Sequence, residues 1–353
     1  MNQRKTLALV LTVLGLLLAV AGPFLPGGIH LTPIGPPGAG HVTSLIATDQ
    51  GDILAGTQSG EVWRLRDGAW TRENLALGGQ PVLALLGDPG RTPVGTAAGV
   101  FPAAGESPLE GRVGSLLQTE QGLLAGTASG VRLLANGRWS APGPVANIYS
   151  LIGQRRGDGH WLHAGTIGAG VLSTSAAEAG AAWQPNGQGL PAAAKVFSFA
   201  TTQGGLLLAG TDQGVFWQSR PGQPWQSLHP AFDGRRAMSL HLAAGGERQG
   251  RERLWIGGDD GLSSLALVEQ GETLAAEGAP RLADSAQWQP PFGIGAIVTS
   301  GDRLLVSAGA IYAYGPTPLS GWYWISLAGV ALILLAGWSM PRPEATTADS
   351  AAV

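Results

Sequence analysis

The segment Val42-Thr43-Ser44-Leu45, followed by Leu54-Ala55-Gly56-Thr57, is the first copy of a pattern that fills most of the chain. The first segment recurs, with small changes, at Val82–Leu85, Val113–Leu116, Ile148–Leu151, Val196–Phe199, Ala237–Leu240 and Ile294–Ile297. The second recurs at Val94–Thr96, Leu124–Thr127, Ala164–Thr166, Leu208–Thr211, Trp255–Gly258 and Val306–Ala308. Dividing the 288 residues of 29–316 by seven copies gives about 41 residues each, the length of a four-stranded propeller blade.

Each part of the repeat has a structural interpretation. The short Val, Leu and Ile runs are bounded by glycine and are too brief for helices, so they predict buried strands. A glycine after each Ala-Gly-Thr segment predicts a hairpin with positive φ, at Gly60, Gly99, Gly130, Gly170, Gly214 and Gly261. A late tryptophan predicts an outer-strand residue that fills the gap between blades, at Trp70, Trp139, Trp183, Trp225 and Trp288. The sequence therefore predicts an all-β fold, a seven-bladed β-propeller.

The seventh copy is short, because the chain passes from Tyr314 to Pro316 and then to an apolar segment. We expect its missing fourth strand to come from Ile29–Ile34, upstream of the first blade. Such an exchange closes the ring and removes two unpaired strand edges. Pro33 limits how regular this strand can be.

Residues Thr6–Leu25 contain no charge and follow Arg4 and Lys5. A helix of this length can cross a bilayer, and the basic flank places its N-terminal side in the cytoplasm. The alternative is a secretory signal peptide, with Ala19-Val20-Ala21 as the small residues before the cleavage site. Both interpretations deliver the following residues to the outside of the membrane.

A second apolar run, Trp322–Met340, has aromatic residues near both edges, as is typical of a membrane-spanning helix. The sequence therefore predicts one transmembrane helix on each side of the propeller, in the cell membrane, with the propeller on the extracytoplasmic side. The predicted parts are residues 1–28 (anchor or signal peptide), 29–316 (propeller), 317–341 (transmembrane helix) and 342–353 (short cytoplasmic tail).

The composition excludes several classes of function. The 353 residues include no cysteine, so disulfides and thiolate metal sites are impossible. A net charge of −3 gives no electrostatic reason to expect a nucleic-acid partner. No phosphate loop, dinucleotide fingerprint or helical zinc motif occurs, so we expect no cofactor and no metal.

The repeat resembles the sialidase-like (BNR) β-propeller superfamily, and within it the Ycf48-like photosystem II assembly factors and the two-component-regulator propeller repeats. The Ala-Gly-Thr-x-x-Gly-Val strings are similar to the former, and Leu254–Leu262 is similar to the latter. The resemblance covers nearly all of residues 42–315, although the Ser-x-Asp-x-Gly-x-x-Trp box common in the superfamily does not occur. It implies an extracytoplasmic binding or assembly module, often without chemistry.

A sialidase-type active site needs a tyrosine nucleophile with a carboxylate partner and an arginine cluster. Tyr149, on a predicted inner strand, is the one tyrosine placed to serve, and the paired arginines are expected to be solvated loop residues. His160 and His163 are three apart on a predicted strand and so face opposite sides, which argues against a shared metal ion. We therefore expect no catalytic activity.

Charged side chains on neighbouring hairpins and connections are the predicted binding residues: Asp212, Asp259, Asp260, Arg235 and Arg236. Acidic and basic groups brought together there, with Trp225 and Phe232 nearby, would suit a protein partner or a polar ligand, although aspartate also simply favours turns. The predicted function is a membrane-anchored scaffold or assembly factor that binds a membrane protein or membrane complex. The alternative is a sialidase-like protein that binds or cleaves glycans.

Overall fold

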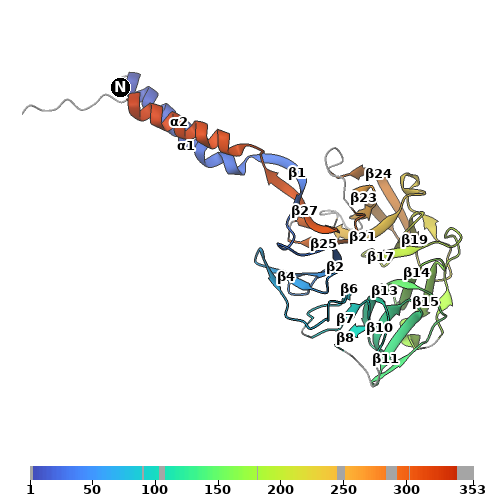
Figure 1. The fold of residues 1–353 in the computed structure, drawn as a ribbon. Helices are drawn as coiled ribbons and strands as arrows, with labels where there is room; N and C mark the ends of the chain where they lie inside the picture. The colour runs from blue at the N-terminus through green and yellow to red at the C-terminus, as the bar shows by residue number, and fades with distance from the viewer. Residues whose placement is uncertain are drawn as a thin grey trace, which may run out of the picture. The chain divides into compact units, whose positions relative to one another are not determined.

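The computed structural model describes residues 3–89, 91–102, 108–180, 182–244, 251–283, 292–301 and 303–339. Within these residues the chain forms seven sheets, six with four strands and one with three. The sheets are arranged around a common centre as the blades of a propeller (Figure 1). The predicted seven-bladed fold is confirmed.

The first three blades follow the order of the chain. Blade 1 consists of β2 (Val42–Ala47), β3 (Ile53–Thr57), β4 (Val62–Arg66) and β5 (Ala69–Arg72). Blade 2 consists of β6 (Val82–Leu85), β7 (Val94–Thr96) and β8 (Val100–Phe101). Blade 3 consists of β9 (Val113–Thr119), β10 (Gly122–Thr127), β11 (Gly130–Ala135) and β12 (Arg138–Ser140).

The next three blades continue in the same order. Blade 4 consists of β13 (Ile148–Arg156), β14 (Gly159–Thr166), β15 (Val171–Ser175) and β16 (Gln184–Pro185). Blade 5 consists of β17 (Val196–Thr201), β18 (Leu207–Thr211), β19 (Gly214–Gln218) and β20 (Gln226–Ser227). Blade 6 consists of β21 (Ala237–Ala244), β22 (Arg251–Gly258), β23 (Gly261–Gln270) and β24 (Thr273–Leu282). Short 3-10 helices occupy Gly22–Phe24 (η1), Ala176–Glu178 (η2) and Pro230–Phe232 (η3).

Blade 7 is closed by a strand from the N-terminal side of the propeller. Its order is β1 (Pro26–Pro33), β27 (Ala310–Pro318), β26 (Arg303–Ala308) and β25 (Ala296–Ser300). The predicted exchange is confirmed, with the strand beginning at Pro26 and ending at Pro33 rather than running from Ile29 to Ile34. Proline has no N–H for a sheet ladder, which agrees with the strand ending at residue 33.

Blade 2 differs from the prediction of four strands in every blade. The described residues of this blade form three strands, and Gly99 makes only an isolated bridge to Glu110. Pro102 follows β8 directly, and without an N–H it cannot extend the ladder of hydrogen bonds.

The glycine of each Ala-Gly-Thr segment marks the contact between neighbouring blades. A Cβ on Gly56 would lie 2.4 Å from Ser44 Oγ and 2.4 Å from Val82 Cγ1 of the next blade. The pairing of first and second strands is shifted by a bulge at this level in blades 1 to 6. The repeat therefore combines a bulge, a small residue and a glycine so that the next blade can approach closely.

The core is divided among the gaps between blades. Seven clusters of buried apolar side chains occur, one between each pair of neighbouring blades. Trp70 and Trp139 lie on the outer strands β5 and β12, whereas Trp183 and Trp225 directly precede β16 and β20. Trp288 lies outside the described residues. All six predicted hairpin glycines have positive φ.

Two helices form the second compact unit of the chain. This unit comprises residues 1–30 and 316–353, and the propeller unit comprises Leu31–Gly315. The helices α1 (Gln3–Ala21) and α2 (Trp322–Ser339) are both long and apolar enough to cross a membrane. Most of their residues are exposed, unlike those of a core helix in a globular protein. The predicted tail, residues 342–353, lies outside the described residues.

The two helices contact each other through small residues. Ser326 Oγ donates a 3.0 Å hydrogen bond to the carbonyl oxygen of Ala19. A Cβ on Gly22 would lie 2.3 Å from Ser326 Oγ, and a Cβ on Gly15 would lie 2.6 Å from the carbonyl oxygen of Gly329. The helices are therefore antiparallel, and small residues allow their backbones to approach.

Candidate functional site

The propeller has two faces with different turns. We call the hairpin face the one that carries the turns between second and third strands, such as residues 57–61, and the connections between blades. We call the turn face the one that carries the turns between first and second strands, such as residues 48–52. The predicted binding residues belong to the hairpin face.

The structure brings four of the five predicted binding residues together. Arg235 binds Asp260 at 2.8 Å, and Arg236 binds Asp259 at 3.0 Å. About half of the surface of these four side chains is exposed to solvent. The cavity beside them has a volume of only about 20 Å³. Each charge is already neutralised by its partner, and exposed pairs of this kind contribute little energy.

Asp212, the fifth predicted residue, has a different role. Its carboxylate accepts a 2.9 Å hydrogen bond from the N–H of Lys195, and its own N–H donates to the carbonyl of Lys195. These bonds fasten the blade 5 hairpin to the connection from blade 4. The aromatic residues predicted to lie nearby, Trp225 and Phe232, are buried and leave no aromatic surface for a ligand.

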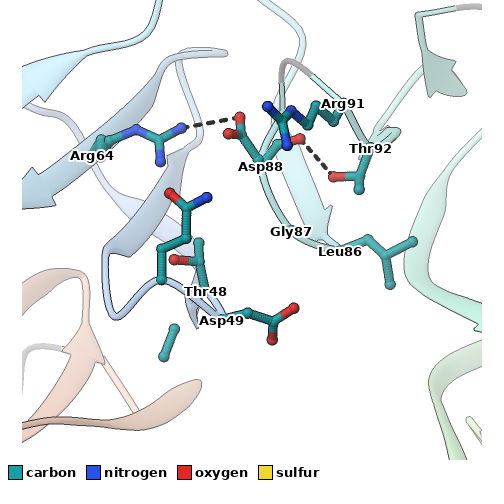
Figure 2. A pocket seen from close by; sticks show the side chains of 10 residues that line it. Thr48, Asp49, Arg64, Leu86, Gly87, Asp88, Arg91 and Thr92 are labelled. Atoms are coloured by element: carbon teal, nitrogen blue, oxygen red, sulfur yellow. Dashed lines mark hydrogen bonds and ion pairs between the residues drawn. The ribbon is translucent and has the colours of Figure 1, made fainter.

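A second charged cluster lies within blade 1, centred on Arg64. The Arg64 guanidinium binds Asp52 at 2.8 Å, Asp88 of blade 2 at 3.1 Å, and Glu73. Arg64 is 9% exposed, which is rare for an arginine unless it is paired. Figure 2 shows Arg64 and Asp88 meeting across the gap between the two blades.

Asp52 connects this cluster to the surface. Its carboxylate accepts hydrogen bonds from Arg66 as well as from Arg64. Hydrogen bonds from Arg66, which has the larger effect, and from Arg64 lower the pKa of Asp52 to about 2. The carboxylate is therefore ionised throughout the physiological range and holds both arginines in place.

Two cavities flank the Asp52 turn on the turn face. The first, of about 250 Å³, lies between blades 1 and 2 and is lined by Thr48, Asp49, Gln50, Arg64, Asp88 and Arg91, among others (Figure 2). The second, of about 370 Å³, lies between blades 7 and 1 and is lined by Gln50, Arg66, Asp67, Trp70 and Arg303, among others. Both are near the lower limit of small-molecule sites, and Gln50 borders both.

One buried polar atom at the first cavity has no partner. The hydroxyl of Thr48 is shielded from solvent and makes no hydrogen bond within the structure. A buried hydroxyl without a partner costs free energy, so such an atom calls for an explanation. At Thr48 the adjoining cavity can supply one, in the form of water or a bound polar group.

The sequence interpretation missed this part of blade 1, although one signal was present. Counting from the valine at or next to the start of the third strand in blades 1, 3 and 4, Arg64 takes the place of Leu133 in blade 3 and Ser173 in blade 4. Both of those residues are buried. An arginine at a buried position of a repeat indicates a local departure from the common core.

The residues considered for catalysis are not arranged for it. Tyr149 lies on the inner strand β13, with the guanidinium of Arg112 5.5 Å from its ring centre and Phe197 packed edge-on. No carboxylate contacts its hydroxyl among the described residues. His163 is fully buried and bonds to Ser173 and Gln154, and no cluster of metal-binding side chains occurs in the part of the chain that the structure covers.

Comparisons with known proteins support the fold. No protein-family model and no curated protein matches the chain. Among solved structures, the extracellular domain of the hybrid two-component system BT4673 from B. thetaiotaomicron matches with a TM-score of 0.62 and 16% identity. The match covers 82% of this chain and 40% of that one, so this chain spans less than half the length of that relative.

Two further solved structures have similar propellers. Ycf48 bound to D1 peptide matches with a TM-score of 0.54 and 14% identity, over 82% of this chain and 97% of that one. The WD40 propeller domain of Doa1 matches with a TM-score of 0.52 and 12% identity, over 81% of this chain and 96% of that one. At these identities the comparisons show the propeller fold and do not assign a function.

Proposed function

We propose that this protein is a membrane-anchored, extracytoplasmic β-propeller that binds a protein partner, as a scaffold or assembly factor for a membrane complex. One observation carries the proposal. The neighbouring strands β1 and β27 of blade 7 continue into the two apolar helices α1 and α2. The propeller is thus joined through both of its end strands to helices of membrane-spanning length.

The contact between the helices supports a retained anchor over a cleaved signal peptide. The residues Ala19–Ala21, proposed above as a cleavage motif, belong to α1, and the carbonyl of Ala19 accepts the bond from Ser326. Cleavage there would remove the partner of α2. We therefore propose two spans, with the basic residues Arg4 and Lys5 at the start of α1 on the cytoplasmic side.

Two considerations favour a protein partner in or at the membrane. Tethering restricts the propeller to a thin layer, which raises its effective concentration toward membrane proteins. Ycf48, which has a similar fold, was solved bound to a peptide, and the sialidase-like resemblance implies a binding module. The hairpin-face residues Asp212, Asp259, Asp260, Arg235 and Arg236 remain the predicted contact surface, on the grounds of their exposure and mixed charge.

Crosslinking in native membranes, followed by affinity capture of the full-length chain, tests this function. We expect a membrane protein in stoichiometric amount, captured less well when Arg235, Arg236, Asp259 and Asp260 are all changed to alanine. Arg132→Ala with Arg253→Ala, also on the propeller, serves as a control. Absence of any stoichiometric protein would contradict the scaffold function.

The topology and the absence of catalysis have separate tests. Reporter fusions after Val353 and within Glu247–Glu252 should report opposite sides of the membrane. A mature chain that begins at Gly22 would instead establish the signal peptide. Turnover of a sialoside, abolished by Tyr149→Phe with the fold intact, would establish the sialidase-like alternative.

A further inference from the structure

Two glutamines hold the same place in different blades. Gln50 is the eighth residue after Val42, and Gln121 is the eighth residue after Val113. Their turns read Thr48-Asp49-Gln50-Gly51 and Thr119-Glu120-Gln121-Gly122. The blade 1 turn is longer, because Ala47 pairs with Ile53 there whereas Thr119 pairs with Gly122 in blade 3.

In blade 3 this glutamine binds a polypeptide backbone. The side-chain amide of Gln121 donates a hydrogen bond to the carbonyl of Ala177, and its oxygen accepts a 3.1 Å bond from the N–H of Gly180. The bound segment includes η2 and comes from blade 4, directly after β15. The amide therefore supplies one donor and one acceptor to the same stretch of main chain.

In blade 1 the corresponding glutamine borders open space. Gln50 lines both cavities, and its one hydrogen bond among the described residues is a long 3.5 Å contact from the exposed Arg66. The buried hydroxyl of Thr48, two residues earlier, has no hydrogen-bond partner in the part of the chain that the structure describes. Blade 1 therefore has a polar site with a cavity on each side. At the same position, blade 3 binds a segment of blade 4.

Each cavity is also lined by one basic and one acidic side chain that form no ion pair with the described residues. These are Arg91 and Asp49 in the first cavity, and Arg303 and Asp67 in the second. The arginines between them, Arg64 and Arg66, are already bound by carboxylates. The site thus offers main-chain hydrogen bonding at its centre and charges of both signs on each side.

We propose that Gln50 binds the main chain of a segment of the partner protein, as Gln121 binds residues 177–180. Acidic and basic side chains of that segment would contact Arg91 and Asp49 on one side and Arg303 and Asp67 on the other. This inference rests on the proposed function, since it names a second contact surface, on the turn face, and the chemistry of the partner segment that binds there. A Cβ on Gly315, the last residue of the propeller unit, would lie 3.3 Å from Cγ of Arg303. The proposed site is therefore close to the point where the chain leaves the propeller.

A photo-crosslinking residue in place of Ala47, which is exposed and lines the first cavity, reports on the occupant. The full-length chain in native membranes should crosslink to a partner segment that contains both acidic and basic residues. Gln50→Glu removes the amide donor with little change of shape, so the yield should fall roughly tenfold, as for a loss of about 1.4 kcal/mol. Gln203→Glu, on the corresponding turn of blade 5, should leave the yield unchanged.

Arg91→Ala combined with Arg303→Ala should also lower the yield, whereas Arg155→Ala with Arg220→Ala, on the turn face of other blades, should not. Crosslinking of position 47 to residues 103–107 of the same chain would overturn the proposal, as would an unchanged yield in Gln50→Glu. Capture of a partner that depends only on the hairpin-face residues would overturn this site and leave the scaffold function intact. Capture of no partner by any variant would contradict both.

Discussion

Gly15 of α1 and Gly329 of α2 face each other so closely that neither position has room for a side chain. A Cβ on Gly15 would lie 2.6 Å from the carbonyl oxygen of Gly329, and a Cβ on Gly329 would lie 2.5 Å from that of Gly15. The contact is between backbones. It makes the two apolar helices one packed unit rather than two independent helices.

This relationship predicts that Gly15→Leu separates the helices. Because the chain has no native cysteine, Ala19→Cys with Ser326→Cys allows oxidative crosslinking to report the contact. We expect a crosslink in the parent chain and a several-fold lower yield with Gly15→Leu. Leu16→Ala, at an exposed position of α1, is the control and should leave the yield unchanged. A parent chain without the crosslink would show that α1 is absent from the mature protein.

A second prediction concerns closure of the ring. Leu31 of β1 is 9% exposed and packs in the cluster between blades 6 and 7, with Ile297 and Leu304. Leu31→Ala should therefore lower the free energy of unfolding by about 2–5 kcal/mol. Ile29→Ala, at a 56% exposed position of the same strand, should change it little. Chemical denaturation measures both, and equal stability of the two variants would show that β1 does not hold blade 7.

Gly210 provides a third prediction, on the contact between blades 5 and 6. A Cβ there would lie 2.5 Å from Ser198 Oγ and 2.7 Å from the carbonyl oxygen of Ala237. Gly210→Val should therefore prevent close approach of the blades and severely lower the melting temperature. Gly187→Val is the control, because nothing lies within 4 Å of its Cβ position. A melting temperature of Gly210→Val close to that of the control would contradict this account of the repeat.

The sequence was sufficient for the fold because the signals are local and repeated. The short apolar strands recur in all seven copies, and the small residue and the glycine recur in the first six, so the copies reinforce one interpretation. The strand exchange followed from counting, since the last copy lacked a strand and Ile29–Ile34 had no other place. That Arg235 and Arg236 would lie near Asp259 and Asp260 followed from the adjacency of a hairpin and a connection, whereas the individual ion pairs are seen only in the structure.

The blade 1 site could not be predicted in the same way. Its carboxylates, Asp52, Glu73 and Asp88, come from three separate turns and connections, and only the folded ring brings them to Arg64. The contact between α1 and α2 could not be predicted from the sequence either. Gly15, Ala19 and Gly329 are visible in the sequence, but helical spacing alone does not show which faces of two helices meet.

A fourth prediction separates buried from exposed ion pairs. Arg64→Met leaves three carboxylates without their common partner in a largely buried site, so it should destabilise the fold by about 3–5 kcal/mol. Arg72, which is itself 60% exposed in its pair with Glu61, provides the control. Arg72→Met should cost less than about 1 kcal/mol. Chemical denaturation near neutral pH measures both, and a small effect at Arg64 would contradict the role of the cluster.

The last prediction is a pH dependence that originates in blade 4. His163 is 0% exposed, and burial lowers its pKa to about 3. The folded protein therefore keeps this imidazole neutral between its bonds to Ser173 and Gln154, while the unfolded chain binds a proton below a pH of about 6.5. The unfolded state then holds more protons, so the free energy of unfolding falls as pH decreases from about 6.5 toward 3.

His163→Gln removes this titration, and we expect a smaller loss of stability between pH 6.5 and pH 4.5 than in the parent chain. The difference in slope should approach about 1.4 kcal/mol per pH unit, the value for one proton. Denaturation at a series of pH values compares the slopes rather than the absolute stabilities, so the measurement tolerates the packing change at residue 163. Equal slopes in the parent and His163→Gln would show that His163 already carries a proton in the folded protein.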